Sequence, residues 1–101
     1  MRRGTTPTLT FTTPYEASLI DGGFLTFRQG KRTVLDISLT DQAVTIEDEA
    51  ISVTLTQEQT LLFSSEKFAQ AQIRASLSSG KAVASNIVQI PIGAILKNGV
   101  I

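Results

Sequence analysis

The sequence contains no cysteine, no histidine and no tryptophan among its 101 residues. Histidine and cysteine are the side chains that most often serve as general base, thiolate nucleophile or zinc ligand. Without cysteine there is also no disulfide, so the core and the backbone hydrogen bonds must hold the fold. These absences remove most hydrolase mechanisms, and we predict a protein that is not an enzyme.

Net charge is also absent, because nine Lys and Arg residues balance nine Asp and Glu residues. A neutral chain has no overall field that would draw it to nucleic acid or to an anionic membrane. No apolar run approaches the roughly 20 residues of a membrane-spanning helix. Residues 4–8, which follow Met1-Arg2-Arg3, are polar, so we expect no secretion signal. The sequence predicts neither a nucleic-acid partner nor a membrane partner.

What the chain does contain is enough apolar material for a core. Hydrophobic residues make up 42% of the sequence and charged residues 18%, which is typical of a globular protein and not of a disordered one. A chain of this length is too short for two independent cores. We therefore predict a single domain that spans residues 1–101.

Apolar and polar residues alternate along most of the chain, which is the pattern of strands with one face in a core. Clusters of turn-forming residues interrupt the alternation, among them Asp21-Gly22-Gly23. Residues 17–20 fit either a short strand or an irregular crossing. The predicted strands cover residues 8–12, 24–29, 33–39, 44–46, 51–55, 68–77 and 83–92.

One helical turn is expected within this pattern of strands. Thr56 and Gln59 have the spacing of a capping box, in which each side chain satisfies a backbone amide near the other residue, so we predict a helix over residues 57–62. Pro91 lacks an amide donor and belongs at a sheet edge or a bulge. Turn signals every 8 to 12 residues predict an antiparallel sandwich or barrel, and we favour the sandwich.

Few side chains are candidates for chemistry. Glu47, Asp48 and Glu49 are adjacent, and Asp21, Asp36 and Asp41 lie in or near predicted turns, but no calcium-loop motif is present and a solvated acidic turn is the simpler interpretation. Arg2 and Arg3 could bind a phosphate or an acidic partner, although two such residues are typical of a solvated, flexible end. The aromatic residues are not interleaved with basic ones, so we expect most of them in the core. We predict no metal and no cofactor.

The last residues of the sequence do not resemble an ordinary chain end. Frayed ends are usually polar, whereas residues 95–101 contain four large apolar side chains. This segment either folds back on its own core as a further strand or turn, or docks on another subunit. The predicted interface residues are Ile95, Leu96, Val100 and Ile101.

Four short motifs stand in order along nearly the whole chain: RRGTTPT at residues 2–8, TFRQ at 26–29, LTQEQTL at 55–61 and ASNIV at 84–88. Together they resemble a family of small uncharacterised proteins of phages and prophages of Firmicutes. The layout is also similar to the N-terminal immunoglobulin-like domain of phage baseplate upper proteins. The resemblance implies an all-β, immunoglobulin-like antiparallel β-sandwich with one short helical turn near residues 57–62, and it assigns no catalytic residue.

These observations together predict a non-enzymatic structural or assembly protein of a phage or prophage, associated with a tail or baseplate. Its partners would be copies of itself or other phage structural proteins, in the cytoplasm of the bacterial host or in the virion. The alternative is a small adaptor or regulatory module that recognises a host or phage protein through its loops.

Overall fold

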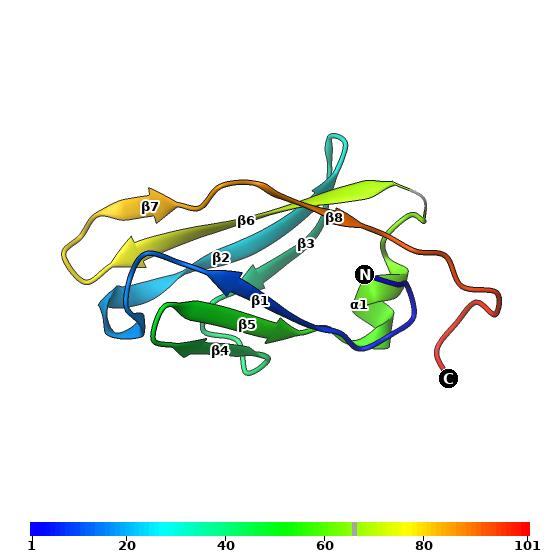
Figure 1. The fold of residues 1–101 in the computed structure, drawn as a ribbon, viewed down its shortest axis with the longest axis horizontal. Coiled ribbons are helices and arrows are strands. Elements are labelled where there is room, and N and C mark those ends of the chain that lie inside the picture. The colour runs from blue at the N-terminus through cyan, green and yellow to red at the C-terminus, as the bar shows by residue number, and fades with distance from the viewer. Residues whose placement is uncertain (66) are drawn as a thin grey trace.

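The structure, a computed structural model, describes residues 1–65 and 67–101 as two antiparallel β-sheets that pack face to face (Figure 1). A 3-10 helix, η1 (Ala17–Leu19), precedes β2, and an α-helix, α1 (Gln57–Leu61), links the two sheets. The predicted sandwich is confirmed, because the strands form two sheets and not a closed barrel. The strands are β1 (Thr8–Thr12), β2 (Ile20–Gln29), β3 (Arg32–Ser38), β4 (Val44–Glu47), β5 (Ala50–Thr54), β6 (Phe68–Leu77), β7 (Ala82–Ala84) and β8 (Val88–Pro91).

The strand order identifies the type of sandwich. The smaller sheet has the order β1-β5-β4, and the larger has the order β3-β2-β6-β7, with β8 following β7 along the same edge of β6. Taken in chain order, these strands have the arrangement of strands B, C, C′, D, E, F and G of an immunoglobulin sandwich. In that fold strand A lies beside strand B. Here β1 takes the place of strand B, and within the described residues no strand pairs with its outer edge.

The core lies between the sheets and follows the predicted alternation. On β6 every second residue from Ala69 to Leu77 is buried, and the residues between them face outward, as predicted. Three of the five inward residues of β6 are the alanines Ala69, Ala71 and Ala75, and they leave room for larger side chains from the other strands. Phe27 and Phe63 meet edge to face in this space, with ring centroids 5.7 Å apart.

Two of the six aromatic residues, most of which we expected in the core, are exposed. Phe24 on β2 and Phe68 on β6 are 52% and 60% exposed. Each lies next to an inward-facing residue, Leu25 or Ala69, and successive side chains of a strand point to opposite faces. Position in the strand therefore outweighs hydrophobicity at these two sites.

The predicted helical turn is confirmed as α1, together with its cap. The backbone amide of Gln59 donates to the Thr56 hydroxyl at 3.1 Å, and the amide of Thr56 donates to Gln59 Oε1 at 2.9 Å. Thr60 is fully buried, and its hydroxyl donates to the Thr5 carbonyl at 3.0 Å. The helix is thereby attached to the segment that leads into β1.

The turn predicted at Asp21-Gly22-Gly23 is wrong, because these residues belong to β2. Gly23 has a φ of +143°, and a Cβ atom there would lie 2.0 Å from the Arg74 carbonyl oxygen of β6. The register between β2 and β6 shifts between Ile20 and Gly22, as it does at a β-bulge. The glycine therefore serves a close approach of two strands and not a chain reversal.

The run predicted as one strand over residues 83–92 is two strands. Arg74 pairs with Ala84 on β7, whereas Ala71 pairs with Val88 on β8, so the register changes between them. At the change, the Ser85 hydroxyl accepts from the amide of Ile73 at 3.0 Å. Pro91 ends β8 at a sheet edge, which confirms the prediction for this residue.

Candidate functional site

The adjacent acidic residues lie on the surface. Glu47, Asp48 and Glu49 are exposed at the turn between β4 and β5. The fold brings Glu16 near Asp48 and Glu49 around a shallow hollow, a meeting that the sequence spacing did not signal. No group of three or more His, Cys, Asp or Glu residues that could hold a metal ion occurs in the part of the chain that the structure describes.

The other carboxylates make local structural contacts or face solvent. Asp36 on β3 accepts a hydrogen bond from the Thr26 hydroxyl at 2.6 Å. Asp41 accepts from the amide of Ala43 at 2.9 Å, as in an Asx-turn. Asp21 is exposed on β2. Among the described residues, none of these three joins the acidic turn in a group that could hold a metal ion.

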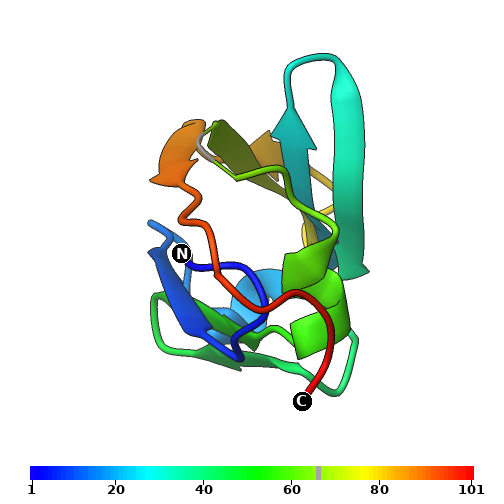
Figure 2. The ribbon, with the colours of Figure 1, turned by 90° about the vertical axis from the view of Figure 1, so that its right-hand side faces the viewer.

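The N-terminal residues are held in place, so the prediction of a solvated, flexible end is wrong. The amino group of Met1 donates to the Pro91 carbonyl at 2.7 Å, and the Arg3 amide donates to the Gly93 carbonyl at 3.1 Å. The Arg3 guanidinium donates to the Leu61 carbonyl at the end of α1 at 3.1 Å. Figure 2 shows this N-terminal segment beside the chain that leaves β8. These contacts close one end of the sandwich. The Arg3 side chain connects the N-terminal segment to α1, and the Arg2 side chain connects it to Ala94.

The tail segment, residues 93–101, divides the four predicted interface residues into two groups. Ile95 is half-buried against the start of the chain, where its Cδ1 atom would lie 2.8 Å from a Cβ atom at Gly4. Leu96 is fully exposed, Ile101 is 95% exposed and Val100 is 55% exposed.

The tail nevertheless rests on its own sandwich through its backbone. The amide of Ile101 donates to Gln57 Oε1 at 2.9 Å, and Gln57 Nε2 donates to the Ile101 carbonyl at 3.4 Å. Both bonds lie at the exposed surface of α1. The backbone of the tail segment thus folds back onto its own sandwich. The side chains of Leu96, Val100 and Ile101 remain exposed to solvent.

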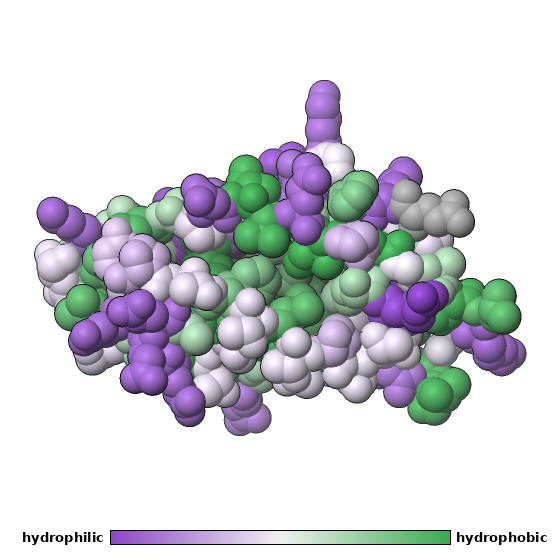
Figure 3. Space-filling model, in the orientation of Figure 1, coloured by the Kyte–Doolittle hydropathy of each residue, from purple (hydrophilic) through white to green (hydrophobic). Residues whose placement is uncertain are grey.

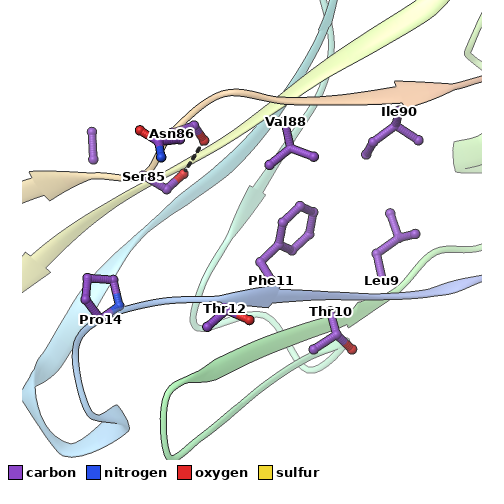
Figure 4. Close-up of a pocket in the computed structure, with 10 residues that line it drawn as sticks. Leu9, Thr10, Phe11, Thr12, Pro14, Ser85, Asn86, Val88 and Ile90 are labelled. Atoms are coloured by element: carbon purple, nitrogen blue, oxygen red, sulfur yellow. Dashed lines mark hydrogen bonds between the residues drawn. The ribbon is translucent and has the colours of Figure 1, made fainter.

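A groove that the sequence did not predict runs along the open side of the sandwich (Figure 4). We call it the β1–β8 groove. Leu9 and Phe11 point into it from β1, and Val88 and Ile90 point toward them from β8. Figure 3 shows hydrophobic residues along the hollow in the middle of this face. The groove has a volume of about 600 Å³, and none of its lining residues carries a charge.

The backbone of β1 is directed into this groove at every second residue. The amide of Leu55 donates to the Pro7 carbonyl, and the amide of Thr13 donates to the Glu49 carbonyl, so the odd-numbered residues of this segment bond to β5. In an antiparallel pair the alternate residues turn their amides and carbonyls to the other side. Thr8, Thr10 and Thr12 therefore present hydrogen-bonding groups to the groove.

The opposite rim is partly occupied. The carbonyls of Pro91 and Gly93 accept from Met1 and Arg3, so the N-terminal segment covers this end of the rim. The backbone amides and carbonyls of an edge strand point alternately toward its neighbour and away from it. The backbone groups of Gln89 therefore face the same open side as the carbonyl of Pro91. The groove is thus closed at the end where Met1 and Arg3 bond to Pro91 and Gly93, and it is open along β1 and the first part of β8.

Exposed aromatic residues on the outer face of the larger sheet do not form a second such surface. Phe24 pairs with Arg74, which lies six residues along β6 from Phe68. At about 3.3 Å per residue the two rings are separated by roughly 20 Å. They are isolated exposed side chains and not one patch.

Two further findings bear on function. No helix among residues 1–65 and 67–101 has the length and apolar character needed to cross a membrane. No protein-family model, curated protein or solved structure matches the chain. The tail segment and the β1–β8 groove are therefore the features from which a function can be argued.

Proposed function

We propose that this chain is a structural or assembly protein that acts through protein–protein contacts and without catalysis. The carrying observation is the exposure of Leu96, Val100 and Ile101 in the tail segment. The phage or prophage context, with a tail or baseplate as the place of assembly, rests on the resemblance of the sequence motifs. The protein would then act in the cytoplasm of the bacterial host or in the virion.

The physical support is the gain from covering these side chains. Full burial of a Leu, Ile or Val side chain contributes about 1.5–3 kcal/mol relative to exposure. Three such residues within six positions form a concentrated apolar contact, whereas single exposed apolar residues are ordinary. Covering all three side chains would contribute roughly 4.5–9 kcal/mol, which is comparable to the cost of association of about 4–15 kcal/mol, so further contacts around the tail must add to the affinity.

The test is the solution mass measured by light scattering. The full chain should form an oligomer, and a version that ends at Ile95 should be a folded monomer. The cut is placed there because Ile92 is buried in the core and Ile95 is half-buried, so an earlier end would damage the sandwich. The full-length triple variant Leu96→Ser, Val100→Ser, Ile101→Ser is the matched control, and it should also be a monomer.

A full chain that stays monomeric at high protein concentration would contradict this proposal. That result would favour the alternative function, an adaptor or regulatory module that stays monomeric until a host or phage protein is added.

A further inference from the structure

We infer that the β1–β8 groove is the acceptor for the tail segment of a second copy, which adds to β1 as an extended strand. This inference rests on the proposed function and specifies its contact. Among the described residues, the groove is lined by the half-buried Leu9, Phe11 and Ile90 and by the exposed Val88, and the tail exposes Leu96, Val100 and Ile101. The inference joins them as acceptor and donor.

The groove has the geometry of a strand site. Thr8, Thr10 and Thr12 direct amides and carbonyls toward it, and these groups are the partners that an added strand requires. The position beside β1 is where strand A lies in an immunoglobulin sandwich. Half-buried Leu9 and Phe11, together with Val88 and Ile90, form the apolar floor on which the inward side chains of the added strand would rest.

The tail has the pattern that this floor accepts. Leu96, Asn98 and Val100 project to one face when the segment is extended, and Ile101 projects to the other. Asn98 is uncharged, and the groove lining includes the polar residues Ser85 and Asn86 beside its apolar ones. Lys97 lies between Leu96 and Asn98 in sequence and projects to the opposite face, into solvent. This is the required arrangement, because the residues that line the groove carry no charge and would leave a buried ammonium group without a partner. Residues 96–100 also equal β1 in length, at five residues.

The donor must come from another copy. Contacts of Gly93 and Ala94 with Arg3 and Arg2 hold the start of the tail at the end of the sandwich, and from there it runs to α1 (Figure 1). The N-terminal segment therefore lies between the tail and the groove of the same copy. Among the hydrogen bonds that the structure describes, release of the distal tail, residues 96–101, breaks only the two exposed ones between Ile101 and Gln57.

Disulfide trapping between two copies tests the contact directly, because the natural chain has no cysteine. One copy carries Val100→Cys in the tail, and the other carries Val88→Cys in the groove and a size tag. The matched control acceptor is Ile87→Cys, which is adjacent in sequence and similarly exposed but does not line the groove. We expect the mixed disulfide with the Val88→Cys copy to form at least about tenfold faster than with the control, because docking raises the local thiol concentration.

Equal trapping at the two positions would overturn the groove assignment. If the full chain were at the same time a tail-dependent oligomer by light scattering, the proposed function would stand and this inference alone would fail. If the full chain were a monomer, both would fail.

A second measurement avoids any change in the groove. The amides of Thr10 and Thr12 face the groove, so their hydrogen exchange should slow by at least about tenfold as the concentration of the full chain rises. The triple variant Leu96→Ser, Val100→Ser, Ile101→Ser should show no such slowing. Unchanged exchange at these two amides in an assembled full chain would contradict strand addition to β1.

Discussion

Gln29 shows how one buried polar side chain can fix a loop. It is 7% exposed at the end of β2, and its amide group makes two hydrogen bonds with the backbone of Ser64. Nε2 donates to the Ser64 carbonyl at 2.9 Å, and Oε1 accepts from the Ser64 amide at 2.7 Å. The Gln29 side chain thus makes the pair of hydrogen bonds that a neighbouring strand would make. It satisfies the backbone amide and carbonyl of Ser64, which follows α1.

Gly23 gives the sharpest prediction at the scale of single residues. Gly23→Ala should lower the free energy of unfolding by about 2 kcal/mol or more, because the new Cβ would overlap the backbone of β6 at an unfavourable φ. Gly22→Ala is the control, since its Cβ would meet nothing closer than Ser76 Oγ at 3.8 Å. Urea denaturation of both variants checks the prediction, and equal effects would show that the close approach of β2 and β6 is not the cause.

At the scale of elements, local sequence signals determine where structure begins and ends. The capping box fixes the start of α1 at Thr56, and the Ser85 contacts mark the point where β7 gives way to β8. Both signals use a short hydroxyl side chain that competes for backbone hydrogen bonds. The first has a recognisable spacing in the sequence, and the second does not.

The cap of α1 can be tested with a pair of substitutions. Thr56→Ala removes the acceptor for the Gln59 amide and should cost about 1 kcal/mol of unfolding free energy. Thr56→Ser keeps the hydroxyl and should be close to the natural protein in stability. If thermal or urea unfolding gave the same loss for both variants, the cap would not be the origin of the effect.

At the scale of the whole molecule, the sandwich is closed at one end and open along one side. The N-terminal segment bonds to residues 91–93 and α1 fills the adjacent end, whereas β1 and β8 face each other across an apolar groove. An exposed strand edge next to an apolar floor is a place where another chain can add. Shape and composition therefore support the assembly that we propose at this side.

Because its large apolar side chains are exposed, the distal tail should contribute little to the unfolding free energy of the sandwich. At concentrations where the protein is monomeric, a version that ends at Ile95 should keep its unfolding free energy to within about 0.5 kcal/mol, because the lost side chains are exposed. A version that ends at Pro91 should lose about 2 kcal/mol or more, since it lacks the buried Ile92. A large loss in the first version would mean that the tail packs on its own core in solution.

The sequence by itself determined most of the strands, their inward faces and the capped helical turn α1. Alternation on β6 and the spacing of Thr56 and Gln59 are local properties, and side-chain direction in a strand or a capped turn follows from the backbone over a few residues. The exposed tail residues could be named for a similar reason, since apolar side chains at a chain end stand out without any tertiary information.

The tertiary structure alone decided the role of Gly23, the anchoring of Arg3 and the existence of the β1–β8 groove. Each depends on segments far apart in the chain: Gly23 meets Arg74, Arg3 meets Leu61, and Phe11 faces Val88 across the groove. In the sequence alone, two adjacent glycines predict a turn. Only the tertiary structure shows that the backbone of β6 lies against Gly23. Likewise, an edge strand becomes a binding site only when the packing of the two sheets leaves that edge open, and no local pattern in the sequence specifies this arrangement.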